Sequence, residues 1–267
     1  MNKSIDYGRR SEIFDVGNHT VLKLYNTGFP KDKILQEFHN SKIIYGLKKL
    51  LIPNPLEVVK KNNRLGILFE KIEGIALMTL FQQNPIRYFT YGKIIANLHK
   101  KVHEISLSNI PSQVESFRES IKKTELLSQN EKVMLHGLLR DNTVKQLCHG
   151  DFHHGNIIMT PGGDFFIIDW MDAFYGDPLL DVALTSVNAS VSDAPPHVPY
   201  FYRKIYDVLK KISELDRRYL YLYGVPNDKH INRILLLAAG IHLSHMKKHE
   251  SKNHRIYFDT IRSTLQI

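Results

Sequence analysis

The sequence has one cysteine, Cys148, among 267 residues, so no disulfide can form within the chain. This usage is typical of a reducing compartment. The first ten residues, MNKSIDYGRR, lack the apolar core of a signal peptide. The longest apolar run, Ile234–Ile241, is too short to cross a bilayer and is expected to be a buried helix. These absences predict a cytoplasmic protein with no membrane partner.

Internal repeats, low-complexity segments and nucleic-acid-binding motifs are also lacking. The net charge is +9, and the excess of basic residues lies toward the two ends of the chain. Positive charge alone could attract nucleic acid. However, no basic run alternates with aromatic residues as nucleic-acid-binding segments do, so no nucleic-acid partner is expected.

The first 70 or so residues alternate short apolar runs with turn signals. Gly17-Asn18 lies between two such runs and indicates a hairpin. Pro30 opens a segment with helical spacing, and its expected apolar face is listed here: Ile34, Leu35, Phe38 and Ile43. Two further strand-like runs follow at residues 56–60 and 65–69. The predicted order is strand, strand, helix, strand, strand.

The pattern changes after the segment Glu70–Gly74. It is helical nearly to residue 145, with a clear amphipathic helix at Tyr91–Ile105. A small hairpin, Asn156–Met159 and Phe165–Asp169, interrupts it, and helices resume at Pro178. The sequence therefore predicts an α+β protein. Its small N-terminal antiparallel β lobe with one helix would span residues 1–74, and its larger, mainly helical lobe residues 75–267.

Residues 149–156, HGDFHHGN, concentrate titratable side chains at the start of that hairpin. One interpretation is a zinc site on Cys148, His149, His153 and His154. All these candidates fall within seven residues, however, and no second pair of ligands follows at the spacing of a structural zinc site.

Oxygen ligands offer a better interpretation. Asn156 follows Asp151 by five residues, and Asp169 ends the second strand of the hairpin. A loop asparagine and an aspartate at a strand end can converge on Mg²⁺. The second aspartate, Asp151, would then accept the proton of an attacking hydroxyl, which is the division of roles found in kinases.

The motifs HGDFHHGNIIM and FFIIDWMDAFYGDPLLDVA, with VLKLY in the N-terminal part, resemble the aminoglycoside phosphotransferase and choline kinase family. The resemblance covers residues 8 to 184. It implies a two-lobed protein-kinase-like fold that moves the γ-phosphate of ATP or GTP to a small molecule, with Mg²⁺ as cofactor. It further implies that Asp151 is the catalytic base, that Asn156 and Asp169 hold the metal, and that Lys23 binds phosphates beside its partner Glu37.

The resemblance also assigns less specific positions. The turn carrying Gly8 and Ser11 matches the nucleotide-binding loop, although Gly8 is its only glycine. The backbone of Glu70, Lys71 and Ile72 matches the hinge that docks the base.

In the second lobe, the resemblance implies that Asp181 braces the catalytic loop through backbone N–H groups. His149 is expected to have a structural role. The family usually has proline at the position of His154, so the edge of the loop departs from the pattern.

The acceptor is expected to be a small hydroxylated molecule. The motifs D-F-G and A-P-E are absent, and only eight residues separate Asp169 from Pro178, too few for a peptide platform. Basic charge in the last third favours a neutral or anionic acceptor over an aminoglycoside. The aromatic residues of the last third are expected to lie in the core: Tyr200, Phe201, Tyr202, Tyr206, Tyr219, Tyr221 and Tyr223. The alternatives are an aminoglycoside-modifying resistance kinase and a non-catalytic nucleotide-binding module.

Overall fold

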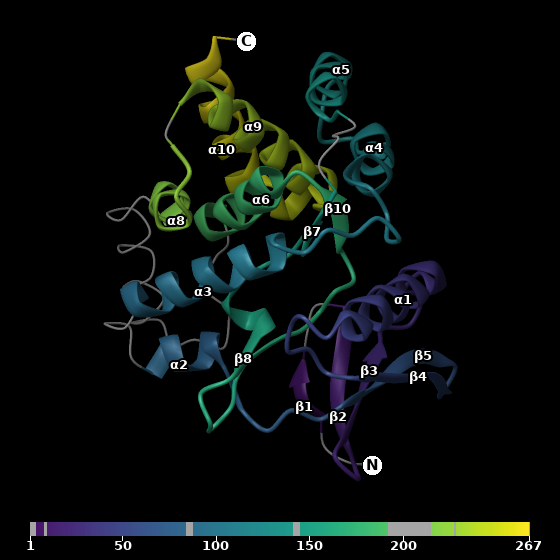
Figure 1. The fold of residues 1–267 in the computed structure, drawn as a ribbon. Helices are drawn as coiled ribbons and strands as arrows, with labels where there is room; N and C mark the ends of the chain where they lie inside the picture. The colour runs from purple at the N-terminus through teal and green to yellow at the C-terminus, as the bar shows by residue number, and fades with distance from the viewer. Residues whose placement is uncertain are drawn as a thin grey trace. The chain divides into compact units, whose positions relative to one another are not determined.

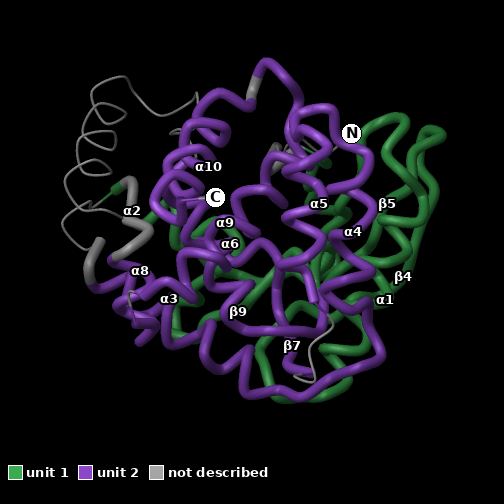
Figure 2. Tube along the Cα trace, turned by 90° about the horizontal axis from the view of Figure 1, so that it is seen from above, with its two compact units in different colours: residues 1–83, 154–173 green, residues 84–153, 174–267 purple. Residues whose placement is uncertain are grey.

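A computed structural model describes residues 4–7, 10–83, 88–140, 145–191, 215–226 and 228–266. The chain divides into two compact units, which are described separately (Figure 2). Unit 1 comprises residues 1–83 and 154–173, and unit 2 comprises residues 84–153 and 174–267. Within the described ranges, every helix is too short or too polar to span a membrane.

Unit 1 is built on a five-stranded antiparallel sheet with the strand order β1-β2-β3-β5-β4. Its strands are β1 (Ser4–Tyr7), β2 (Ser11–Gly17), β3 (Thr20–Tyr25), β4 (Pro55–Lys61) and β5 (Arg64–Glu70). The tight turns use residues that tolerate positive φ. The predicted hairpin between β2 and β3 turns at Asn18 and His19, directly after Gly17, and Asn62 and Asn63 turn the chain between β4 and β5.

Helix α1 (Lys31–Leu47) follows Pro30 as predicted and packs on β4 and β5 (Figure 1). Its buried face differs from the expected apolar stripe, because Leu35 is exposed. The residues that are buried are Ile34, Glu37, Asn40, Ser41 and Ile44. Three of these five are polar, which is unusual for a core-facing helix and indicates that the face serves a site.

A second sheet of unit 1 has the order β6-β8-β9. It consists of β6 (Ile75–Ala76), β8 (Ile157–Met159) and β9 (Phe165–Ile167), the last two forming the predicted hairpin, with helix α2 (Leu77–Gln83) next to β6. Gly74 enters β6 against β8, where a Cβ atom would lie 2.5 Å from the carbonyl oxygen of Met159. Only glycine fits such an approach.

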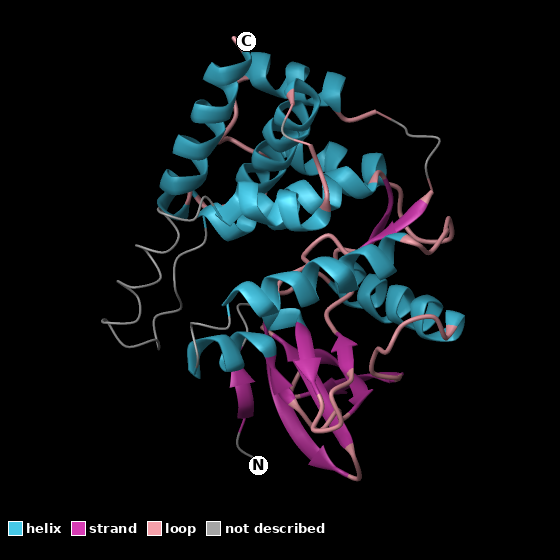
Figure 3. Cartoon of the chain, turned by 60° about the vertical axis from the view of Figure 1, so that its left-hand side comes forward, coloured by secondary structure: helices cyan, strands magenta, loops and turns pink. Residues whose placement is uncertain are grey.

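Unit 2 is mainly helical (Figure 3). Its helices are α3 (Tyr88–His103), α4 (Gln113–Lys123), α5 (Gln129–Leu138), α6 (Pro178–Val191), α8 (Leu215–Tyr223), α9 (Lys229–Ser244) and α10 (Lys252–Leu265). Strands β7 (Gln146–Cys148) and β10 (Phe174–Gly176) pair antiparallel beside them, and a short 3-10 turn, η3, spans Lys248–Glu250.

Local sequence fixes several helix boundaries in unit 2. Ser112 and Ser128 each form a capping box with the glutamate three residues later, and Pro178 begins α6 as predicted. The apolar run Ile234–Ile241 lies in the buried part of α9, also as predicted.

The aromatic residues of the last third only partly follow their prediction. Tyr219 is buried, whereas Tyr221 is 79% exposed on α8, so the core assignment was wrong for Tyr221. Tyr200, Phe201, Tyr202 and Tyr206 lie outside the described residues.

The predicted α+β class is confirmed, with an antiparallel sheet near the N-terminus and a mainly helical remainder. The compact units are a division by packing and differ from the expected lobes 1–74 and 75–267. Residues 75–83 and 154–173 join unit 1 because β6 pairs with β8, and because the segment after β9 contacts α1.

Candidate functional site

Three charged side chains that the sequence places far apart meet in unit 1. The Nζ atom of Lys23, on β3, lies 2.7 Å from Oε1 of Glu37 on α1 and 2.9 Å from Oδ1 of Asp169 after β9. Tyr25 donates its hydroxyl to the other oxygen of Glu37. This confirms the expected proximity of Lys23 and Glu37 and adds Asp169 to the same cluster.

Burial and charge compete within this cluster. Burial lowers the pKa of the Lys23 ammonium, but the attraction of the Asp169 and Glu37 carboxylates outweighs it, so the net pKa is raised. Burial raises the pKa of Glu37, and Lys23 opposes that change. Two carboxylates around one buried ammonium leave an excess of negative charge, which suits a site that receives a cation.

Asp169 has a backbone conformation that non-glycine residues seldom adopt, with φ at +65°. It follows β9, whose Ile167 pairs with Ile157 of β8. One step further along, the Ile168 N–H donates to the Asn156 carbonyl at 3.0 Å. The two predicted metal ligands are therefore neighbours across the end of one hairpin, with Asn156 in the short 3-10 turn η2 (His154–Asn156).

The donor chemistry of this hairpin end fits Mg²⁺. A carboxylate and an amide oxygen are hard ligands of the kind this cation selects, and few protein ligands are needed because Mg²⁺ keeps waters and substrate phosphates. Asn156 is buried and Asp169 about one-third exposed, so a cation held here would face both protein and solvent.

The turn that precedes β2 lies partly outside the described residues, and Gly8 with it. Ser11 begins β2 and is buried opposite Tyr25. The neighbouring Arg10 was missed by the sequence interpretation. Its guanidinium lies 2.7 Å from Oδ2 of Asp172, three residues after Asp169, and so brings a positive charge to the segment after β9.

The segment after β5 presents its backbone alternately to its two sides. The N–H groups of Glu70 and Lys71 donate to the carbonyls of Asn54 and His19, at 2.9 and 2.8 Å. The Lys71 ammonium pairs with Asp15 and Glu73. Among the described residues, the Ile72 N–H has no hydrogen-bond partner. This donor could therefore receive a planar base, whereas the Lys71 side chain is already paired.

The loop that carries Asp151 belongs to unit 2. The Asp151 N–H donates to Nδ1 of the buried His149 at 3.3 Å. The Asp151 carboxylate is about one-third exposed, and Nε2 of His153 lies 3.7 Å from it. Phe152 is buried and stacks on His99 of α3, with ring centroids 4.1 Å apart. The loop thus buries His149 and Phe152 and leaves the Asp151 carboxylate accessible.

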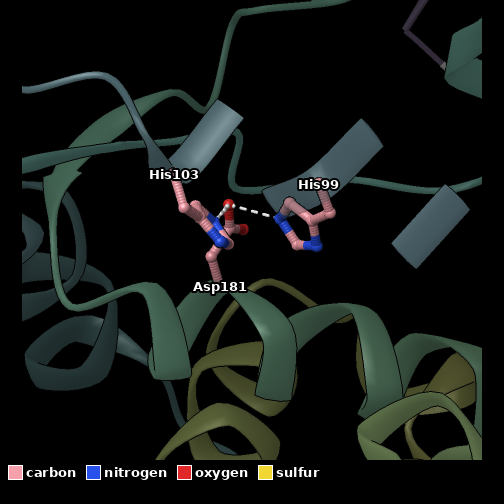
Figure 4. Close-up of side chains that lie close together, drawn as sticks. All are labelled: His99, His103 and Asp181. Carbon is pink, nitrogen blue, oxygen red and sulfur yellow. Dashed lines mark hydrogen bonds and ion pairs between the residues drawn. The ribbon is translucent and has the colours of Figure 1, made fainter. Parts of the chain in front are cut away.

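The carboxylate of Asp181, on α6, binds the backbone of this loop. The carboxylate accepts the N–H groups of His149 and Gly150 at 2.6 and 2.9 Å, as expected for a brace. It also accepts Nε2–H of His99 at 2.9 Å and of His103 at 3.1 Å, both from α3 (Figure 4). The other ring nitrogens meet the hydroxyls of Tyr219 and Tyr223, each at 2.7 Å.

The hydrogen bonds define the protonation state of the cluster. Burial raises the pKa of Asp181, but His99 and His103 more than compensate, and the net pKa is held well below its usual range. Burial, aided by His103, lowers the pKa of His99 to about 4. An ionised Asp181 carboxylate accepts Nε2–H of a neutral His99, whose Nδ1 then accepts from the Tyr219 hydroxyl, so both ring nitrogens of His99 are satisfied.

Histidines do form a compact group, but not where the zinc interpretation placed it. Within the described ranges, the one group of three close ligand atoms consists of His99, His103 and Asp181. The hydrogen bonds from His99 and His103 to Asp181 already explain why these three side chains lie so close together. Cys148 is buried, and burial raises its pKa well above the usual range, which disfavours the thiolate that zinc requires.

Comparison with family models decides the relationship. The model of the phosphotransferase enzyme family matches residues 8–212. The chain belongs to this family. The match covers both sets of residues described above and bears out the resemblance drawn from the motifs. Among curated protein sequences, none matches.

Solved structures of family members share the fold. A thermostable mutant of the aminoglycoside phosphotransferase APH(4)-Ia is 17% identical, with a TM-score of 0.64 over 98% of this chain and 94% of that one. The choline kinase LicA from Streptococcus pneumoniae is 16% identical, with a TM-score of 0.59 over 99% and 92%. Two structures of the aminoglycoside phosphotransferase APH(3'')-Id from Streptomyces rimosus are each 17% identical and cover 86% of this chain. One has a TM-score of 0.54 over 89% of its own chain, and the complex with ADP and streptomycin has a TM-score of 0.53 over 90%.

Membership of the phosphotransferase family makes the chain a nucleotide-binding kinase of small molecules, which acts on hydroxyl groups. Sequence interpretation missed three features of the site: the Arg10 pair, the histidines of α3 and the buried Asn40. His99 and His103 are spaced i, i+4 on one face of a helix, a signal that was available but has many structural explanations.

Proposed function

We propose that this phosphotransferase moves the γ-phosphate of ATP or GTP to a hydroxyl of a small molecule in a Mg²⁺-dependent reaction, with Asp151 as the catalytic base. The observation that supports this most is the cluster of Lys23, Glu37 and Asp169 beside Asn156. It combines a fixed ammonium with a carboxylate and an amide oxygen, the groups that phosphates and their cation require.

Each of these residues has a defined task in the proposal. Lys23 binds the α- and β-phosphates, and Glu37 holds the ammonium in place from α1. Asp169 and Asn156 hold Mg²⁺, which when bound offsets the charge of the phosphate oxygens. The Ile72 backbone docks the base, and the turn with Gly8 and Ser11 borders the phosphates.

Asp151 acts on the acceptor. Its accessible carboxylate accepts the proton of the attacking hydroxyl and orients that oxygen toward phosphorus. Because Asp181 fixes the N–H groups of His149 and Gly150, the backbone that precedes Asp151 has little freedom. The loop therefore holds the base in place by hydrogen bonds as well as by the packing of Phe152.

The acceptor is a small molecule rather than a peptide. Helix α6 begins at Pro178, so only eight residues follow Asp169 before the next helix. Related structures hold hygromycin B or streptomycin, and a further relative is a choline kinase. A panel of aminoglycosides, choline and neutral or anionic sugars and amino alcohols covers both the resistance kinase and the metabolic alternatives.

The first test is a thermal-shift titration with ATP and GTP, each with and without Mg²⁺. The wild type, Asp169→Asn and Asp164→Asn are compared, because Asp164 is an exposed aspartate in the same β8–β9 hairpin. We expect stabilisation that requires Mg²⁺, is lost in Asp169→Asn and is retained in Asp164→Asn. Equal stabilisation of all three proteins would remove Asp169 from the metal site.

A second test separates a kinase from a binding module. Asp151→Asn should retain the Mg²⁺-dependent thermal shift and lower turnover of an identified acceptor at least a hundredfold. Turnover within about twofold of the wild type would show that Asp151 is not the base. A wild type that binds nucleotide but turns over no member of the acceptor panel would favour the binding module.

A further inference from the structure

The backbone of Asp169 is held from its N-terminal side by the β8–β9 hairpin. The Ile167 N–H donates to the Leu51 carbonyl at 2.9 Å, and the Ile168 N–H donates to Asn156 at 3.0 Å. A hairpin alone would not keep the next residue at a positive φ, because the extended and right-handed conformations are more favourable for an aspartate. Contacts beyond the hairpin must therefore contribute to the conformation of Asp169, and the Lys23 ammonium is one of them.

Asn40 of α1 supplies a contact after Asp169. Its Nδ2 atom donates to the Trp170 carbonyl at 3.0 Å and lies 3.4 Å from the Ala173 carbonyl. Gln36 donates to its Oδ1 atom at 2.7 Å, which fixes the orientation of the amide. Asn40 is completely buried, so water cannot replace these contacts.

The position of Asn40 couples two parts of the site. Glu37 lies one helical turn before it on α1 and holds Lys23, which in turn contacts the Asp169 carboxylate. One helix thus contacts both the side chain of the cluster and the backbone that follows Asp169. The free-energy cost of the left-handed conformation is about what one hydrogen bond contributes. The hydrogen bond from the Asn40 amide can therefore decide which conformation Asp169 adopts.

We propose that Asn40 is a positioning residue, which holds the segment Trp170–Ala173 so that Asp169 stays in the conformation that binds Mg²⁺. The inference rests on the proposed function for its consequence, the metal affinity, but its structural part stands without it. Removal of the amide donor should loosen the hold of α1 on the segment Trp170–Ala173 and allow Asp169 to leave the left-handed region.

Trp170 permits a direct test, because it is the only tryptophan in the chain and is buried. Asn40→Asp keeps the size but sets a carboxylate oxygen against two carbonyls, and Asn40→Leu is a second variant of similar volume without a donor. Ser41→Ala is the matched control, since the neighbouring hydroxyl is buried and has no hydrogen-bond partner among the described residues. All are measured without nucleotide or metal, and far-UV circular dichroism reports the folded fraction.

We expect red-shifted tryptophan emission and greater acrylamide quenching in both Asn40 variants at unchanged circular dichroism, and wild-type behaviour in Ser41→Ala. Emission and quenching equal to those of the wild type in a folded Asn40 variant would overturn the positioning role. If Asn40→Asp does not fold, Asn40→Leu carries the comparison.

The functional consequence is measured as the ratio of nucleotide affinities with and without Mg²⁺. We expect Asn40→Leu to lower the affinity with Mg²⁺ about tenfold, as for one lost buried hydrogen bond, and to leave the affinity without Mg²⁺ unchanged. A general packing defect would lower both affinities alike and would contradict the inference. A wild type whose nucleotide affinity does not depend on Mg²⁺ would instead contradict the proposed function, and with it the metal-binding consequence.

Discussion

Acid should weaken the fold through His99. Burial lowers the pKa of this histidine to about 4 in the folded protein, against 6.5 for an ordinary histidine. Between these two values the unfolded chain binds a proton that the folded chain excludes, so stability falls as the pH falls from 6.5 toward 4. The contribution is fully present above pH 6.5. A difference of this size in pKa corresponds to about 3 kcal/mol near pH 4, lost at up to about 1.4 kcal/mol for each pH unit.

The assay compares urea unfolding of the wild type and His99→Gln from pH 7 to pH 4.5. Glutamine keeps a donor near the position of Nε2 toward Asp181 but cannot take up a proton. The variant will be less stable at pH 7, and the difference between the two proteins should shrink by about 2–3 kcal/mol as the pH falls. His230→Gln, which removes an exposed histidine, is the control and should follow the wild type. A constant difference between the wild type and His99→Gln across this range would refute the reasoning.

Further substitutions test separate contacts. Asp181→Asn removes the charge that four N–H groups share and should cost about 3–5 kcal/mol in urea unfolding; a loss below 1 kcal/mol would show that the loop does not depend on it. Lys23→Met should lower nucleotide affinity at least tenfold by calorimetry, as for a lost charge-assisted hydrogen bond, and unchanged affinity would exclude Lys23 as a phosphate ligand. Gly74→Val places a side chain against the Met159 carbonyl and should cost about 1–3 kcal/mol, seen as a lower Tm. Glu131→Gln breaks the ion pairs that Arg255 and Arg262 of α10 make with α5 and should cost about 1–2 kcal/mol in urea unfolding. The double variant with Arg255→Ala should lose less stability than the two single variants together, because both remove the same ion pair.

Local patterns in the sequence predicted most of the elements of unit 1. Gly17-Asn18 marked a turn because these residues tolerate positive φ, and Pro30 marked the start of α1 because its φ suits a first helical turn. The motif spacing of Asn156 and Asp169 was likewise informative. Asn156 and Asp169 lie at the two ends of one hairpin, which brings them together by local pairing alone.

Features that depend on long-range contacts could not be predicted in this way. The face of α1 was assigned by counting apolar residues, and Leu35 was therefore placed inside, although the helix buries Glu37, Asn40 and Ser41 instead. The partners of Glu37 and Asn40 lie on β3 and after β9, up to 133 positions away. A single sequence gives no indication of such partners, because a polar residue on a helix is exposed in most proteins.

Each unit is made of two separate segments of the chain, and this order limits how the protein can fold during synthesis. Unit 1 needs residues 154–173, which supply β8, β9 and Asp169, yet these emerge from the ribosome only after residues 84–153 of unit 2. Unit 1 must therefore wait for about half of the remaining chain before its second sheet, β6-β8-β9, can form. A fragment that stops at residue 83 would lack the pairing partner of β6 and the carboxylate that faces Lys23. Neither unit can be expressed as a single continuous segment, so limited proteolysis between them would release pieces that are each incomplete.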